Sequence, residues 1–149
     1  MALATSADTC GAVDPADTDT VRTAAFRLDP VPESAGRARR IVRGLLPDWG
    51  LGRLVEDVDL VVSELVTNAL LHSGEDAAAA EDPVRFELEL RGRRLTARVV
   101  DSSPLPPRPE EAADTAESGR GLVLVEALAS DWDWQDLPDG KAVWATFDL

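Results

Sequence analysis

The sequence predicts a single α/β domain, because long helical patterns and short strand patterns alternate along its 149 residues. The segment from about Arg53 to Leu71 places its apolar side chains on one broad arc of a helix. Residues 84–90, Val-Arg-Phe-Glu-Leu-Glu-Leu, alternate strictly between apolar and polar, as half-buried strands do. Gly92 then marks a turn, and residues 95–100 are expected to return as the hairpin partner. A chain of this length can bury a substantial core in one domain.

Caps and turn-forming residues divide the rest of the chain into further elements. Ser34 is expected to cap the first helix with its side chain, and Pro47 to stop that helix after about Leu46. Residues 1–20 lack periodicity and are expected to form a mobile tail before a domain that spans 21–149. The remaining strands and helices are expected at residues 23–28, 34–46, 119–129, 132–137 and 141–149.

The charge of the chain limits its partners. A formal net charge of −13 lacks the basic face that attracts nucleic acids and anionic membranes, so we expect neither as a direct partner. The first predicted helix is nevertheless locally basic, with Arg37, Arg39, Arg40 and Arg43. This helix is either a partner surface or a solvated face, and the sequence leaves both interpretations open.

We expect a cytoplasmic protein. The amino terminus lacks the basic and apolar regions of a secretory signal, and no apolar run approaches the roughly twenty residues that span a bilayer. Cys10 is the single cysteine, so no disulfide forms within one chain.

The single asparagine and the single histidine of the chain lie close together in the second predicted helix. Glu64, Asn68 and His72 follow one another at intervals of four residues, so each steps by about 40° around the helix. Asn is mildly unfavourable inside a helix, which indicates another role for Asn68. These residues are expected to line the rim between core and solvent, where a carboxylate can act as a base and an amide oxygen can bind Mg²⁺.

Two further segments carry groups that suit a nucleotide. Asp101 ends a predicted strand, where it can accept a hydrogen bond from an amine. Gly119-Arg-Gly121 is expected at a helix start, where backbone N–H groups and the helix dipole favour a phosphate. A cation ligand, a base, an amine acceptor and a phosphate cradle are the parts that an ATP site needs.

Four segments in this order resemble the GHKL ATPases, which include DNA gyrase, heat-shock chaperones, histidine kinases and mismatch-repair proteins. Glu64-Leu-Val-Thr-Asn68-Ala resembles their N-box, and Asp101 falls at the aspartate of their first glycine box. Gly119-Arg-Gly-Leu-Val-Leu-Val125 resembles the second glycine box, and Gly140-Lys-Ala-Val-Trp-Ala-Thr-Phe147 completes the likeness. The small size is similar to that of the anti-sigma factor serine/threonine kinases of bacterial partner-switching systems.

The resemblance implies a fold and a function. The fold is a two-layer α/β sandwich, with helices on one face of a mixed, mostly antiparallel sheet. The function is that of an ATP- and Mg²⁺-dependent serine/threonine protein kinase that is also an anti-sigma factor. Its implied partners are a sigma factor and an anti-anti-sigma protein that carries the acceptor serine, and homodimers are common in the family.

The resemblance also implies a role for each motif residue. Asn68 would coordinate Mg²⁺ at the ATP phosphates, and Glu64 would be the general base for the attacking hydroxyl. Asp101 would accept a hydrogen bond from the adenine amino group. The residues that would close over the phosphates are Gly119, Arg120, Gly121 and Leu122.

The first glycine box departs from the family pattern. The family has Asp-x-Gly-x-Gly, whereas this chain has Asp101-Ser-Ser103-Pro-Leu105, in which Pro104 stiffens the loop. A Ser-Pro version recurs in small members of the group. Intact Glu64 and Asn68 favour the kinase, and the altered loop favours the alternative, a non-catalytic or weakly nucleotide-binding module that sequesters a protein partner. For His72, a phosphate contact, a phosphoacceptor and a bystander at the helix rim are all considered, and the last is favoured.

Overall fold

The computed structural model describes the backbone of residues 21–75, 82–103 and 116–149, with the side chains of these residues except 72–75 and 116–121. The predicted tail at residues 1–20, with Cys10, lies outside the described residues. The elements in chain order are β1 (Val21–Leu28), α1 (Glu33–Asp48), the 3₁₀ turn η2 (Gly52–Leu54), α2 (Val55–Glu75), β2 (Val84–Arg91), β3 (Arg94–Asp101), α3 (Ala116–Leu128), β4 (Asp131–Leu137) and β5 (Gly140–Asp148).

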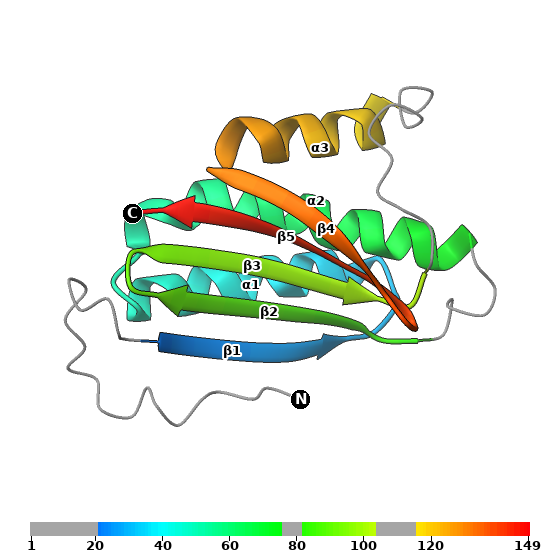
Figure 1. The fold of residues 1–149 in the computed structure, drawn as a ribbon, viewed down its shortest axis with the longest axis horizontal. Coiled ribbons are helices and arrows are strands. Elements are labelled where there is room, and N and C mark those ends of the chain that lie inside the picture. Colours follow the sequence, from blue (N-terminus) through cyan, green and yellow to red (C-terminus); the bar gives the residue numbers. More distant parts are fainter. Residues whose placement is uncertain (1–20, 76–81, 104–115) are drawn as a thin grey trace.

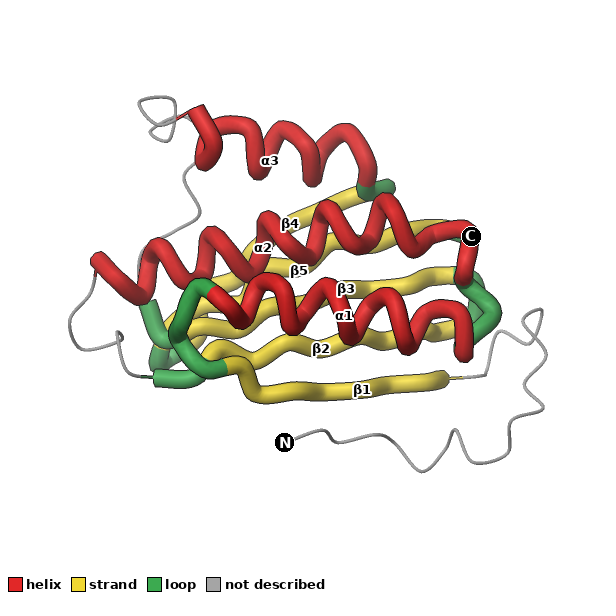
Figure 2. Tube along the Cα trace, turned by 180° about the vertical axis from the view of Figure 1, so that it is seen from behind, coloured by secondary structure: helices red, strands yellow, loops and turns green. Residues whose placement is uncertain are grey.

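The elements form two layers, a sheet on one side and the helices on the other (Figures 1 and 2). The strand order is β1-β2-β3-β5-β4, and each of the four neighbouring pairs is antiparallel. The expected α/β sandwich is thus confirmed, with antiparallel pairing throughout the described sheet. None of the described helices is long and apolar enough to cross a membrane.

Strict alternation in the strands gives the sheet one apolar face. In β2, Phe86 and Leu88 are buried, while Arg85 and Glu87 point to the opposite face. In β3 the buried positions alternate in the same way and end at Asp101. Helix α2 packs against β3, β2 and β5 as well as against α1 and α3, so it covers the centre of the apolar face.

Helix boundaries differ from the sequence prediction in all three helices, and α2 spans Val55–Glu75 instead of about Arg53 to Leu71. Ser34 lies inside α1 and does not cap it; its hydroxyl instead donates a hydrogen bond of 2.6 Å to the carbonyl oxygen of Asp29. Pro47 lies in the last turn of α1, where a missing N–H removes a single helical hydrogen bond, so the helix continues to Asp48. Helix α3 begins at Ala116, three residues before the predicted start.

A buried carboxylate joins the first two helices. The Asp59 side chain on α2 is 3% exposed, and both of its oxygens accept hydrogen bonds from the guanidinium of Arg39 at 3.1 Å. Arg43 adds a third bond of 2.8 Å. Because both arginines lie on α1, two of its four basic side chains orient α1 on α2. Part of the predicted basic surface of α1 therefore serves to hold two helices together.

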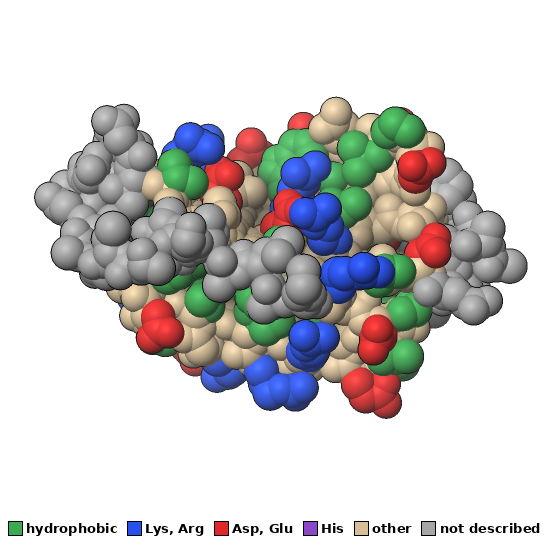
Figure 3. Space-filling model, turned by 90° about the horizontal axis from the view of Figure 1, so that it is seen from below, with side chains coloured by type: hydrophobic (Ala, Val, Ile, Leu, Met, Phe, Trp, Pro, Cys, Tyr) green, Lys and Arg blue, Asp and Glu red, His purple; other side chains and the backbone are tan. Residues whose placement is uncertain are grey.

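Basic side chains gather across the middle of the surface seen from the β1 edge (Figure 3). Arg27 on β1 and Arg85 on β2 are exposed on this side of the sheet, and Arg37 of α1 donates a hydrogen bond of 3.1 Å to the backbone oxygen of Arg27. The net charge of −13 is thus unevenly spread, and this edge is locally basic.

Substitution of Asp59 by Asn tests the connection between α1 and α2. Loss of the charge weakens three hydrogen bonds to guanidinium groups, which we expect to lower the free energy of unfolding by about 1–3 kcal/mol. Urea denaturation of Asp59→Asn measures this change, with Asp136→Asn, on the exposed part of β4, as the matched control. Equal stability of the two variants would contradict a role for the buried carboxylate.

The turn between β4 and β5 approaches the end of β3 very closely. Gly140 has a φ of 155°, which L side chains rarely adopt. A Cβ atom at this position would collide with the backbone carbonyl of Asp101 and with the Cα atom of Ser102. Glycine is therefore required here, because the two backbones leave no room for a side chain.

Gly140→Ala is expected to lower the free energy of unfolding by about 2 kcal/mol or more, since it adds both backbone strain and overpacking. The matched control is Gly44→Ala in the exposed part of α1, where an added Cβ meets no atom within 4 Å. This control should gain about 0.5–1 kcal/mol, because alanine favours the helix. Denaturation curves that shift in the same direction for both variants would refute the close approach.

Candidate functional site

Segments far apart in the sequence meet at one end of the molecule. The carboxyl end of α2, the carboxyl end of β3, the amino end of α3 and the β4–β5 turn all lie at the same end in two opposite views (Figures 1 and 2). These segments carry the residues that the sequence selected for a nucleotide site. Helices α2 and α3 also pack against each other.

Glu64 and Asn68 lie on the same half-buried side of α2. Their neighbours Leu65 and Val66 are buried in the core, at 2% and 0% exposure. The two polar side chains therefore lie at the rim of the core, as their spacing predicts. The His72 side chain lies outside the described residues, so the three interpretations of this residue stay predictions.

Asp101 is buried at the end of β3 and forms an ion pair with Lys141 of β5. The two residues are direct partners in the β3–β5 register, and their side chains are each 1% exposed. Lys141 Nζ lies 3.0 Å from Oδ1 and 3.0 Å from Oδ2 of Asp101. The backbone N–H of Ser103 donates a further hydrogen bond of 2.8 Å to Oδ1. The aspartate is thus held on two sides by groups of its own chain.

This arrangement leaves the carboxylate with one acceptor position. An ionised carboxylate offers about four lone-pair positions. Among the described contacts, Oδ1 of Asp101 accepts hydrogen bonds from Lys141 and the Ser103 amide, while Oδ2 lies 3.0 Å from Lys141 Nζ and has no second donor. The pKa of Asp101 is raised, because burial outweighs the charge and hydrogen bond of Lys141 and the hydrogen bond from the Ser103 amide, all of which lower it.

The segment of the second glycine box lies within α3. Because the helix begins at Ala116, Gly119, Arg120 and Gly121 fall in its first two turns instead of at its first residue. Their side chains lie outside the described set, so their contacts stay a prediction. The Leu122 side chain is 2% exposed in the core, so only its backbone can face a ligand.

Lys141 and Gly140 both lie next to Asp101, and the sequence pattern alone predicted no role for them. The signal for Lys141 was present, because it is the one lysine beside fourteen arginines. Its burial opposite Asp101 depends on the pairing of β3 with β5, which connects residues forty positions apart. Gly140 is explained only by the close approach of its backbone to Asp101.

The donor set at this end fits Mg²⁺ bound together with phosphates. No group of three or more His, Cys, Asp or Glu side chains able to hold a metal occurs in the parts of the chain that the structure describes. Mg²⁺ commonly takes one or two protein oxygens and completes its shell with water and substrate phosphates. A single amide oxygen from Asn68 therefore suits a metal that arrives with ATP better than a permanent metal centre.

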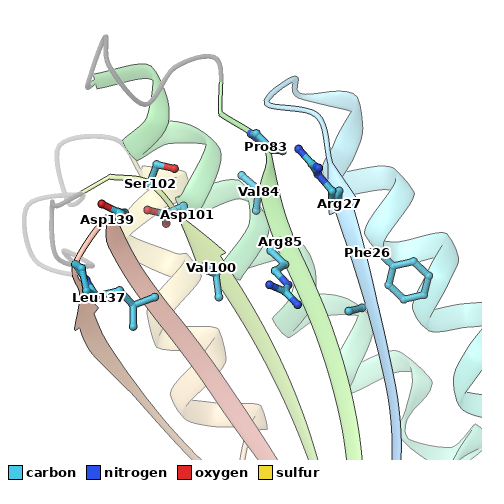
Figure 4. Close-up of a pocket in the computed structure, with 12 residues that line it drawn as sticks. Phe26, Arg27, Pro83, Val84, Arg85, Val100, Asp101, Ser102, Leu137 and Asp139 are labelled. Atoms are coloured by element: carbon cyan, nitrogen blue, oxygen red, sulfur yellow. The ribbon is translucent and has the colours of Figure 1, made fainter. Parts of the chain in front are cut away.

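A cavity of about 600 Å³ opens at the same end on the other face of the sheet (Figure 4). Its lining includes the outward positions Ala25, Arg27, Arg85 and Val100, and also Asp101 at the end of β3. Neither Glu64 nor Asn68 of α2 is among the residues that line this cavity.

Comparison with known proteins identifies a related sequence and a related fold. The chain is 31% identical over 117 residues to a serine-protein kinase RsbW of Oceanobacillus iheyensis, covering 71% of this chain and 74% of that protein. Its fold is similar to a solved structure of RsbU and RsbW domains from Mycobacterium tuberculosis, with a TM-score of 0.65 and 22% identity. That likeness covers 85% of this chain and 32% of the other one.

A family profile also covers most of the domain. The profile of the histidine kinase-like ATPase domain matches residues 28–147, from the end of β1 almost to the end of β5. The matched range contains Glu64, Asn68, Asp101 and the glycine-containing start of α3. The chain therefore belongs to the histidine kinase-like ATPase family.

Proposed function

We propose that this protein is an ATP- and Mg²⁺-dependent serine/threonine protein kinase that also acts as an anti-sigma factor. The observation that carries the proposal is the packing of α2, whose half-buried side carries Glu64 and Asn68, against β3, which ends at the buried Asp101. The 31% identity to a serine-protein kinase RsbW supports the same class of activity. By that similarity, the proposed partners are a sigma factor and an anti-anti-sigma protein with an acceptor serine.

In this proposal each residue has a task that its position permits. Asp101 accepts a hydrogen bond from the adenine amino group at Oδ2, and the first turns of α3 bind the phosphates through backbone N–H groups. The Asn68 amide oxygen binds Mg²⁺, and Glu64 takes the proton of the acceptor serine as its hydroxyl oxygen attacks the γ-phosphorus. ATP supplies the phosphoryl group, and ADP leaves. Most of the catalysis comes from positioning and charge neutralisation.

A second candidate function is a module that binds and sequesters a partner without phosphoryl transfer. The observation that favours it is the burial of Asp101, whose side chain is 1% exposed and already bound by Lys141 and the Ser103 amide. If this end of the site stays closed, nucleotide affinity is low. A phosphorylation assay with the wild type and one Glu64 variant separates the two functions.

Glu64→Ala is expected to reduce phosphoryl transfer to the acceptor serine by about 10²–10⁴-fold, because it removes the proposed general base. Binding of the sigma factor should stay unchanged. The assay follows phosphoserine formation with Mg-ATP, and Glu64→Gln is the matched control that keeps the size of the side chain without its basicity. An inactive wild type, with partner binding unaffected in Glu64→Ala, would favour the sequestering module.

Asn68→Ala is expected to remove the effect of Mg²⁺ on ATP binding, because the amide oxygen is the proposed protein ligand of the metal. Calorimetric titration of ATP with and without Mg²⁺ should show tighter binding with Mg²⁺ in the wild type and no difference in the variant. Thr67→Ala changes the neighbouring half-buried side chain and is the matched control. Retention of the full Mg²⁺ effect in Asn68→Ala would remove Asn68 from the metal site.

A further inference from the structure

Lys141 occupies a place where a lysine is costly. Its side chain is 1% exposed, and removing a charged group from water carries a penalty of several kcal/mol that good partners only partly offset. The chain uses arginine for its fourteen other basic positions, including the two that bind the buried Asp59. The choice of lysine at this one position therefore needs a chemical reason.

The reason lies in the different shapes of the two cations. Arginine pairs with a carboxylate through two parallel N–H bonds, one to each oxygen, in a fixed plane. Lysine is a compact charge on a flexible chain, and here a single Nζ lies 3.0 Å from each oxygen of Asp101. Together with the Ser103 amide on Oδ1, this one nitrogen atom fixes the carboxylate, and Oδ2 has no second donor among the described contacts.

Lys141 also affects whether the carboxyl group of Asp101 is ionised or protonated. An ionised carboxyl only accepts hydrogen bonds, whereas a protonated one also donates. Burial alone raises the pKa of Asp101 and favours the protonated form, and the charge of Lys141 opposes this. Among the described contacts of Asp101, Lys141 is the cation. Asp136 of β4 and Asp139 of the β4–β5 turn are exposed, and Glu64 of α2 is half-buried.

The ionised and the protonated form of Asp101 favour different purines. Adenine carries an amino group at C6, which donates to an ionised carboxylate. Hypoxanthine and guanine carry an oxygen at C6, which an ionised carboxylate repels and a protonated one can bind. The charge state of Asp101 therefore selects between 6-amino and 6-oxo purines.

We propose that Lys141 is the residue that makes this site selective for 6-amino purine nucleotides, because it holds Asp101 ionised and oriented with one acceptor position open. Lys141 is thus a positioning residue that acts on the base through Asp101. This inference rests on the proposed function, since it requires ATP to bind at Asp101.

The test compares binding of ATP and inosine triphosphate (ITP), which differ at C6, to the wild type and to Lys141→Met. The wild type should bind ATP roughly tenfold or more tightly than ITP, because a buried charged acceptor discriminates strongly by hydrogen bonding. In Lys141→Met the ratio should fall to roughly one, with weaker ATP binding and tighter ITP binding. A purely structural role for Lys141 would weaken both nucleotides equally.

Two further variants keep the test decisive if Lys141→Met does not fold. Lys141→Gln keeps a hydrogen-bond donor towards Asp101 without the charge, and its ATP-to-ITP ratio should also fall. Val143→Ala, at the next inward position of β5, loses core packing but should keep the wild-type ratio. Thermal unfolding identifies the variants that are folded under the conditions of titration.

The outcomes separate this inference from the proposed function. A wild type that binds no ATP overturns the proposed function, and this inference with it. A wild type that prefers ATP, together with an unchanged ratio in the folded Lys141 variants, overturns the inference alone. A lowered ratio in Val143→Ala would also overturn it, because selectivity would then follow stability instead of the charge.

Discussion

The inward side chains of β2, β3 and β5 have to be kept from water, and their burial under α2 is the constraint on which the site depends. Burying such side chains contributes about 25 cal/mol for each Å² of apolar surface, so the side of α2 that faces the sheet is determined strongly. Once that side is fixed, Glu64 and Asn68 can lie only at its edge. Their half-buried position is a consequence of how the core packs.

The apolar face of the sheet ends in a buried ion pair. Val99 and Val143 are paired partners in the core, and two residues further along the same strands the inward pair is Asp101 and Lys141. A buried ion pair contributes little to stability by itself. It lies at the end of the molecule that also holds the amino end of α3 and the carboxyl end of α2, and this position suits the binding of a polar ligand. Gly140 allows this geometry, because only a residue without a side chain lets the β4–β5 turn approach Asp101.

Charge serves two purposes in this molecule, and the choice of cation differs between them. Asp59 connects two helices and accepts three hydrogen bonds from two arginines. Asp101 is bound instead by the single lysine, whose Nζ lies 3.0 Å from each carboxylate oxygen. Two arginines of the basic helix α1 therefore hold α1 against α2. The exposed arginines near β1 make that edge of the sheet basic.

The sequence by itself determined the α/β class, the order of the elements and the residues at the rim of α2, because periodicity and spacing are local properties. It placed Asp101 correctly at a strand end for the same reason. Only the tertiary structure decided that Lys141 faces Asp101 and that Gly140 touches its backbone, because strand pairing between distant segments has no local signal. It also decided the true helix ends, since Ser34 finds a tertiary partner in Asp29 and Pro47 is tolerated where few helical bonds remain.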